Sequence, residues 1–219
     1  MAENLKEMVY RSIMEDIVND VYKPLQILNE SSMIERYKCS KSPVREALQS
    51  LCSDGVLRSI PRCGYEVLVI TQDEIIELLN TRYLIEAGFA VQVLEKIQPG
   101  NMEKLEELVT SLASCREDMW KYWEINTQFH LELIKVAGNS YAHSELEKIC
   151  SKLKMAYAQL TRSNWKSGCI SFEVKNHKAI LASIRRKDLC ALRETLRTDL
   201  LGFCDLQYKL VDFFGCSKS

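Results

Sequence analysis

Lysine, arginine and glutamine recur at a four-residue spacing in one short run near the N-terminus, at Lys41, Arg45 and Gln49. On a helix, residues four apart lie on the same face, so Arg45 and Gln49 would project side by side. Arginine can donate two hydrogen bonds to the edge of a guanine, and glutamine can pair in the same way with adenine. Lys41 and Ser42 would stand at the helix start, where backbone N–H groups attract phosphate. We therefore expect these four side chains to contact double-stranded DNA.

The neighbouring residues predict the helix that positions this polar face. Ser42 is a favourable N-cap, and Pro43 fits the first helical position. Apolar residues follow at the spacing of a helix buried on one side, at Val44, Ala47, Leu48, Leu51 and Cys52. Glycine commonly follows a helix C-cap, so Asp54-Gly55 marks the end. The pattern predicts a helix from Ser42 to Ser53 whose other face looks outward.

A β-hairpin is predicted directly after this helix. Two β-prone runs, residues 56–60 and 65–69, are joined by residues 61–64, which include the turn formers proline and glycine. Arg62 gives the turn a basic tip, and Gly64 ends it. In a wing of this kind, we expect Arg62 and Gly64 to approach the minor groove or the DNA backbone.

Two further helices are predicted upstream. Residues 29–32 can cap a short helix that extends to Tyr37. An earlier helix is indicated by a four-residue apolar period at Leu5, Val9, Ile13 and Ile17. Three helices and a hairpin in this order describe a winged helix-turn-helix.

Positive charge is local in this chain. The formal net charge is −1, which argues against indiscriminate coating of nucleic acid. Between Arg36 and Arg62, however, six cationic residues face only two anionic ones. Such a patch suits a protein that reads a specific DNA site and then releases it. Taken alone, a charge run is more often a solvated surface, but the cap, stripe, turn and wing around it favour DNA.

The composition limits the setting in which the chain works. Its 219 residues suffice for one large domain or two small ones. No apolar run reaches the roughly 18 residues of a membrane span, and the N-terminus lacks a signal-peptide core. We therefore expect a cytoplasmic protein with no membrane partner. The nine cysteines are odd in number and form no C-x-x-C pair, so we interpret them as reduced.

Beyond residue 70 the periodicity is helical throughout. Pro99-Gly100 interrupts it, and Asn101 can cap the helix that follows. Helices are predicted over residues 72–98, 101–117, 119–136, 141–162, 171–186 and 188–214. Six helices make a bundle whose interior can hold a ligand. We thus expect a mainly α protein, with a winged helix-turn-helix DNA-binding domain at 1–70 and an all-helical effector-binding and dimerisation domain at 71–219.

Four N-terminal segments resemble the DNA-binding domain of GntR-family transcription regulators. They are residues 28–30, 40–48, 54–57 and 61–67, and the run Pro-Val-Arg-Glu-Ala-Leu within the second is a specific signal. The family usually has arginine where Lys41 stands, threonine where Ser42 stands and glycine where Lys38 stands. Lysine keeps the charge but lacks the planar fork of arginine, so a base contact at Lys41 could become a phosphate contact.

Segments of the second half resemble the FCD-type effector domain of the FadR subfamily. They are residues 82–86, 126–130, 137–139 and 176–180. The resemblance implies a homodimeric regulator, generally a repressor, and a two-fold dimer would read an inverted-repeat operator. It also implies that the helical domain binds a small carboxylic acid effector, often through a divalent metal.

The resemblance places the metal ligands at Asn126, His130, His177 and Asp199. The family pattern has aspartate at the first position and histidine at the last, so Asn126 and Asp199 depart from it. Two imidazoles, a carboxylate and an amide oxygen remain, which suits a divalent ion of the zinc, nickel or manganese kind. Asn126 and His130 are one helical turn apart and can converge. We expect metal binding that is weaker or altered in preference.

Arg82 has two interpretations. It lies four residues before Glu86 on a predicted helix that is otherwise lined with isoleucine, leucine and tyrosine, so an ordinary ion pair would explain it. Its resemblance to an arginine of the family implies instead a clamp for the carboxylate of the effector.

Two other functions stay open at this point. The helical domain could lack metal and sense an apolar or acyl ligand. A metal-dependent enzyme is the second alternative, because two histidines, an aspartate and an asparagine can hold a catalytic ion. The sequence offers no nucleophile elbow, phosphate loop or clear base to accompany that ion, and a DNA-reading domain would have no use in such an enzyme. We therefore expect a regulator and not an enzyme.

Overall fold

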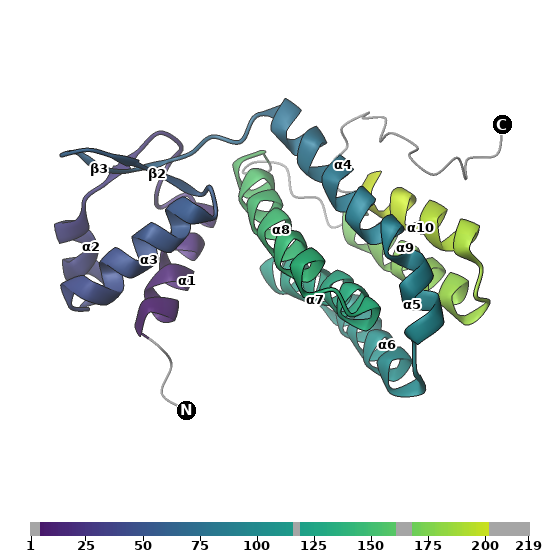
Figure 1. The fold of residues 1–219 in the computed structure, drawn as a ribbon. Coiled ribbons are helices and arrows are strands. Elements are labelled where there is room, and N and C mark those ends of the chain that lie inside the picture. Colours follow the sequence, from purple (N-terminus) through teal and green to yellow (C-terminus); the bar gives the residue numbers. More distant parts are fainter. Residues whose placement is uncertain (1–4, 116–118, 161–167, 202–219) are drawn as a thin grey trace. The chain divides into compact units, whose positions relative to one another are not determined.

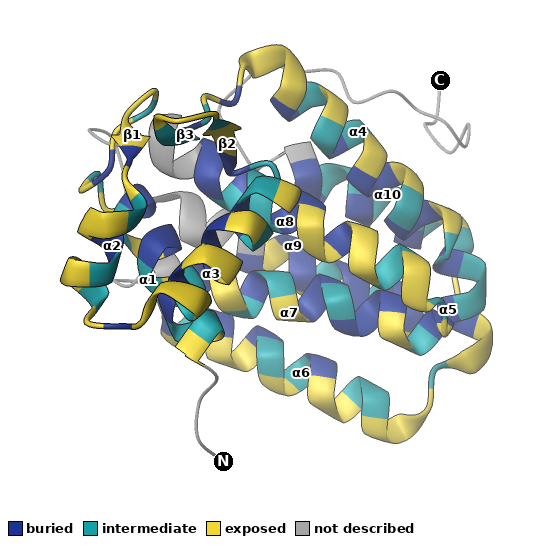
Figure 2. Cartoon of the chain, turned by 60° about the vertical axis from the view of Figure 1, so that its left-hand side comes forward, coloured by how far each residue is buried: buried dark blue, intermediate teal, exposed yellow. Residues whose placement is uncertain are grey.

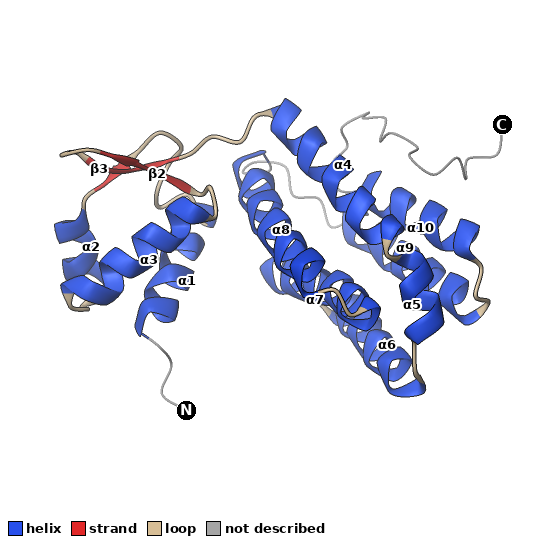
Figure 3. Ribbon diagram, in the orientation of Figure 1, coloured by secondary structure: helices blue, strands red, loops and turns tan. Residues whose placement is uncertain are grey.

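The computed structural model describes residues 5–115, 119–160 and 168–201 of the chain. In this part of the chain, three helices with three short strands come first, and only helices follow (Figures 1 and 3). Contacts divide the chain into two compact units, of which the first runs to Gln72 and also includes the stretch that begins at Ser151. The fold class is the predicted one, a winged helix-turn-helix with an all-helical part after it.

The first unit contains helices α1 (Leu5–Val18), α2 (Glu30–Tyr37) and α3 (Lys41–Ser53) and strands β1 (Ile27–Leu28), β2 (Leu57–Ile60) and β3 (Gly64–Val67). The strands form an antiparallel sheet in the order β1-β3-β2. The helices and the β2–β3 hairpin confirm the prediction. Strand β1 was not predicted, because two residues are too few to show the alternation of a strand.

The apolar stripes of α1 and α3 pack against each other. Cys52, at the edge of the predicted stripe, is only half-buried, and Leu5, at the first position of α1, is exposed. The fully buried stripe residues are Val9, Ile13 and Ile17 of α1 and Val44, Ala47, Leu48 and Leu51 of α3. Since α3 buries one stripe, its other face is left to solvent, as Figure 2 shows.

The cap and first helical residue of α3 lie two residues earlier than predicted. Ser40, in an extended conformation, is the N-cap, so Lys41 is the first helical residue and Pro43 the third. Proline is tolerated there because the first N–H groups of a helix have no partner within it, so its presence does not fix the first position. Ser42, the predicted cap, instead donates a hydrogen bond from its Oγ to Glu46 Oε1 over 2.8 Å.

The end of α3 confirms the prediction of a glycine termination. Gly55 has a φ of +68°, its N–H donates to the carbonyl of Cys52 at 3.1 Å, and the N–H of Val56 donates to that of Leu51 at 2.9 Å. These two bonds form the Schellman motif. Helix α2 also ends in the left-handed region, but there Lys38 occupies the position, with a φ of 50°.

Within the described residues, the regular elements of the second unit are all helices. The unit comprises nearly all of α4 (Gln72–Gly88), with α5 (Ala90–Lys96), α6 (Pro99–Ser114), α7 (Met119–Ala137), the first half of α8 (Ser140–Leu160), α9 (Gly168–Arg185) and α10 (Leu189–Leu201). Helix α7 packs on α5 and α6, and α9 packs on α6 and α10. Among the described residues, no helix is long and apolar enough to cross a membrane.

Two helix boundaries correct the prediction. The helix predicted over 72–98 is divided after Gly88, a poor helix former, into α4 and α5. Helix α6 starts at Pro99, and Asn101 is its third residue rather than its cap. The Asn101 side chain accepts a hydrogen bond of 3.0 Å from the N–H of the N-cap Gln98, which completes a capping box. The predicted helix ends at residues 117, 162 and 214 lie outside the described residues.

Candidate DNA-binding face and buried polar cluster

The polar face predicted on α3 is exposed. Lys41, Ser42, Arg45 and Gln49 all lie on the solvent side of the helix, opposite the buried stripe that holds α3 to α1. Lys41, Arg45 and Gln49 follow one another at four-residue intervals and so form one ridge. The major groove of DNA admits an α-helix, and arginine and glutamine are side chains of the kind that can pair with base edges there.

Lys41 and Arg58, a second cation of the predicted patch, are paired within the chain. The Nζ of Lys41 lies 3.6 Å from Oε1 of Glu30, and Arg58 pairs with Glu66 across the β2–β3 hairpin. The Lys41 side chain is 70% exposed, and an exposed ion pair contributes little stability. Lys41 can therefore exchange Glu30 for a DNA phosphate.

Arg36, another cation of the predicted patch, has a structural role. Its Nε donates to Oδ2 of Asp16 over 2.7 Å, and the hydroxyl of Tyr37 donates to the same oxygen over 2.8 Å. The bond to Asp16 raises the pKa of Arg36, and burial raises the pKa of Tyr37, so both groups stay protonated as donors. These bonds tie α2 to α1 and so fix the frame of the helix-turn-helix.

The wing tip joins an exposed arginine to a glycine required by the fold. Arg62 is exposed and has a φ of 65°. Gly64 has a φ of 134°, and a Cβ at this position would lie 2.4 Å from the carbonyl oxygen of Leu28 on β1. Gly64 is therefore needed for the close approach of β3 to β1, whatever its relation to DNA.

Three of the predicted metal ligands meet in the interior of the second unit. His130 comes from α7, His177 from α9 and Asp199 from α10, and one ligand atom of each lies within 4.8 Å of the others. Asp199 places Oδ2 3.1 Å from Nε2 of His130 and Oδ1 3.4 Å from Nδ1 of His177. Both imidazoles are 0% exposed. Asn126, the fourth predicted ligand, is buried on α7 one turn before His130.

Arg82 and Glu86 of α4 extend this cluster. The ion pair that the sequence allowed is present, with Arg82 Nε 2.6 Å from Glu86 Oε1. The other oxygen of Glu86, Oε2, lies 2.6 Å from Nδ1 of His130. Arg82 Nη2 is buried and has no hydrogen-bond partner among the residues that the structure describes. The sequence identified Glu86 only as a partner for Arg82. A charged pair on an otherwise apolar helix was the one signal that Glu86 is buried and contacts other polar groups.

Phe129 fixes the orientation of both imidazoles and was not predicted. Its ring is fully buried and makes edge contacts with His177, at 4.6 Å between ring centroids, and with His130, at 5.4 Å. Aromatic rings prefer such edge-to-face packing. The sequence gave no signal of this role, since Phe129 is simply the apolar residue before His130.

Together, the charges and hydrogen bonds in the cluster outweigh the effect of burial. Burial is the largest single influence and lowers the pKa of His130, but the charge of Glu86 and the hydrogen bonds with Asp199 and Glu86 together outweigh it, so the pKa of His130 is raised. Burial likewise would raise the pKa of Glu86 and of Asp199. The charges of His130 and Arg82 lower the pKa of Glu86, and those of His177 and His130 lower the pKa of Asp199. Both carboxylates are therefore ionised at neutral pH.

The donor set fits a divalent cation. Asp199 Oδ1 is buried without a hydrogen-bond partner in the described part of the chain. Glu86 is ionised and takes the hydrogen of His130 Nδ1, so an unprotonated Nε2 would turn its lone pair toward Asp199 Oδ2 at 3.1 Å. Two such atoms repel unless a proton or a metal ion lies between them. Two imidazoles and a carboxylate suit zinc, nickel or manganese.

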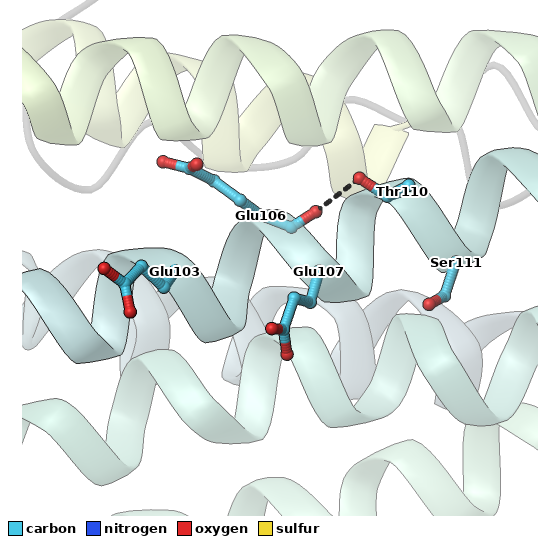
Figure 4. Close-up of a pocket in the computed structure, with 5 residues that line it drawn as sticks. All are labelled: Glu103, Glu106, Glu107, Thr110 and Ser111. Atoms are coloured by element: carbon cyan, nitrogen blue, oxygen red, sulfur yellow. Dashed lines mark hydrogen bonds between the residues drawn. The ribbon is translucent and has the colours of Figure 1, made fainter.

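A separate depression lies on the surface of α6. It has a volume of about 650 Å³, and Figure 4 shows its lining residues along that helix, Glu103, Glu106, Glu107, Thr110 and Ser111. The dashed line marks the bond from Thr110 Oγ1 to the carbonyl of Glu106, at 2.8 Å. This depression shares no residue with the His130 cluster, and its three carboxylates would repel an acidic ligand. We do not regard it as the effector site.

A winged helix-turn-helix with an exposed basic recognition helix, followed by a helical domain with a buried polar cluster, defines a DNA-binding transcription regulator. Residues 5–67 match the bacterial regulatory proteins of the gntR family, and residues 77–201 match the FCD domain. The chain belongs to the GntR family of transcription regulators that carry an FCD domain.

Relatives of the chain agree with this assignment. The chain is 26% identical over 209 residues to the gluconate operon transcriptional repressor of Bacillus licheniformis, with 90% of this chain and 82% of the relative covered. It is 23% identical to the HTH-type transcriptional repressor GlaR of Escherichia coli, with 88% and 90% covered. Among solved structures, E. coli McbR/YncC has the same fold, with a TM-score of 0.78, 21% identity, and 91% and 94% covered.

Proposed function

We propose that the protein is a repressor of the FadR subfamily that binds double-stranded operator DNA through α3. The exposed ridge carries this proposal: Arg45 and Gln49 would read bases, and Lys41 and Ser42 would bind phosphate. Arg62 would reach the minor groove or the backbone from the wing, beside Gly64. The DNA-binding domain would span residues 1–70, and the rest would form the effector-binding and dimerisation domain. Because its proposed target is operator DNA, we infer that it acts in the cytoplasm.

A homodimer with two-fold symmetry would read an inverted repeat, because each copy of α3 meets an equivalent half-site. Several relatives are named as repressors, which supports repression rather than activation. Selection of binding sites from random DNA with the full-length protein tests this proposal. Enrichment of an inverted repeat with half-sites about one helical turn apart supports it. Enrichment of a single half-site without its inverted copy, or of no sequence at all, contradicts the proposal that a dimer binds an inverted repeat.

The effector would be a small carboxylic acid held in the second unit. Arg82 would bind its carboxylate, and His130, His177, Asp199 and the amide oxygen of Asn126 would hold a divalent metal of the zinc, nickel or manganese kind. The bound metal would supply a Lewis-acid site for an oxygen of the acid. The convergence of His130, His177 and Asp199 supports this proposal. Thermal shift of the full-length protein with a panel of small carboxylic acids that includes gluconate, with zinc and with a chelator, tests it.

A metal-free regulator that senses an apolar or acyl ligand is the second candidate. One observation favours it: a protonated His130 would satisfy both Glu86 and Asp199 with no metal present. Stabilisation by acids that requires zinc supports the metal-dependent sensor. Stabilisation that persists with a chelator supports the metal-free one. The relatives are named as transcriptional repressors, so we assign the cluster to sensing rather than to turnover.

A further inference from the structure

Glu86 connects Arg82, which is proposed to bind the carboxylate of the effector, with His130, which is a proposed metal ligand. Its Oε1 accepts a hydrogen bond from Nε of Arg82, and its Oε2 contacts Nδ1 of His130, both over 2.6 Å. Arg82 and Glu86 are each 2% exposed and His130 is 0% exposed, so water does not compete for these contacts. Arg82 and Glu86 belong to α4, whereas His130 lies 44 residues from Glu86 on α7. One carboxylate thus orients a cation and an imidazole from two helices.

The contact between Glu86 and His130 determines which ring nitrogen carries hydrogen. An ionised carboxylate can only accept hydrogen bonds. Since Oε1 of Glu86 is paired at 2.6 Å with the permanently charged Arg82, Glu86 is a carboxylate, and the 2.6 Å contact of its Oε2 requires a hydrogen on Nδ1 of His130. The other ring nitrogen, Nε2, is the one that faces Asp199. A histidine binds metal through the nitrogen that carries no hydrogen.

We propose that Glu86 is a positioning residue that selects the Nδ1–H tautomer of His130, so that Nε2 is presented as a metal ligand, and that holds Arg82 in place for the carboxylate of the effector. The metal part rests on the function proposed above. The tautomer is a property of the metal-free protein and can be measured independently. Carboxylates that orient a ligating histidine commonly change metal affinity about 10–100-fold when they are replaced.

Glu86→Gln tests the proposal because Arg82 has donors only. In this variant the amide oxygen must face Arg82 Nε, and the amide NH2 must then face Nδ1 of His130. An NH2 group donates, so Nδ1 must accept, and the ring hydrogen moves to Nε2. The substitution keeps the shape of the side chain while it reverses the hydrogen bond to His130.

The first measurement is the nitrogen NMR spectrum of the full-length, metal-free protein with labelled histidine, recorded at a pH high enough for the His130 ring to be neutral. We expect hydrogen on Nδ1 of His130 in the wild type and on Nε2 in Glu86→Gln. The second is zinc affinity, measured by competition with a chromophoric chelator, which should fall about 10–100-fold in the variant. Glu132→Gln is the matched control, because Glu132 is a buried carboxylate of α7 that binds Lys104 at 2.6 Å. It should change neither result.

Hydrogen on Nε2 in the wild type, or the same tautomer in both proteins, would overturn the proposal. If the wild type binds no zinc, the proposed metal site fails, yet the NMR comparison still decides the role of Glu86. Because Glu86→Gln leaves Arg82 as a buried, poorly compensated charge that disfavours folding, a second pair of variants removes that charge. Arg82→Met alone should retain hydrogen on Nδ1, and Arg82→Met with Glu86→Leu should lose that preference. If His130 has the same tautomer in the single and the double variant, the role proposed for Glu86 is also refuted.

Discussion

Asp199 of α10 and His130 of α7 face each other over 3.1 Å, carboxylate oxygen to ring nitrogen, inside the helical domain. Glu86 occupies the other ring nitrogen of His130, so this contact needs a positive charge between its atoms. A proton meets that need in the metal-free protein, and a divalent ion meets it in the proposed sensor. The contact therefore makes the two candidate functions experimentally separable.

Replacing Asp199 by alanine should weaken zinc binding by at least about tenfold, because the variant loses the one carboxylate that faces both imidazoles. Chelator competition measures the change. Asp188→Ala is the control on the same stretch of chain, since Asp188 Oδ1 accepts the N–H of Ala191 at the start of α10 and touches neither histidine. Equal zinc affinity in the wild type and Asp199→Ala would remove Asp199 from the metal site.

Asn126→Asp should tighten zinc binding by about tenfold, the equivalent of about 1.4 kcal/mol. The change puts a carboxylate where the family has one, on the turn of α7 before His130. An anionic oxygen binds a divalent cation more strongly than an amide oxygen does. Calorimetric titration of both proteins with zinc gives the comparison. A variant that binds zinc no better than the wild type would show that residue 126 does not reach the metal.

Arg45→Ala should cost about 1–3 kcal/mol of discrimination between the operator and a sequence altered in each half-site, because a bidentate contact to guanine is lost. Fluorescence anisotropy with the two DNA duplexes measures it. Arg185→Ala serves as the control, since Arg185 belongs to α9 of the helical domain and pairs with Glu106 of α6. Should Arg45→Ala retain the full preference for the operator, Arg45 does not read bases.

Gly64→Ala should destabilise the first unit by more than about 1 kcal/mol, because the new methyl group would meet the carbonyl of Leu28 and the φ of 134° disfavours alanine. Urea unfolding gives the free energy. Gly100→Ala in α6, where no atom lies within 4 Å of the added carbon, should instead be neutral or stabilising. Similar stability of Gly64→Ala and the wild type would contradict the packing described for β1 and β3.

The DNA-binding unit was largely predictable because its signals are local. The stripe from Val44 to Leu51 and the termination at Gly55 depend on neighbours within one or two helical turns. The start of α3 was less certain, since Pro43 is accepted at several positions of a first turn. The ion pairs that occupy Lys41 and Arg58 join separate elements, so no local pattern announced them.

The buried cluster was only partly predictable. Family resemblance supplied His130, His177 and Asp199, and the spacing of Arg82 and Glu86 allowed an ion pair on one helix. The contact between Glu86 and His130 joins α4 to α7, and the packing of Phe129 on His177 joins α7 to α9. Both contacts therefore arise from tertiary structure. Periodicity carries no information about such contacts.

The most direct test of the account is the affinity of the full-length protein for its selected operator, measured by anisotropy while small carboxylic acids are added with zinc or with a chelator. We predict that one acid changes this affinity by about 5–150-fold with zinc, the usual range of coupling between two sites. His177→Ala should bind the operator as the wild type does and lose the response. An unaltered response in His177→Ala, or no acid that changes DNA binding under either condition, would contradict the account.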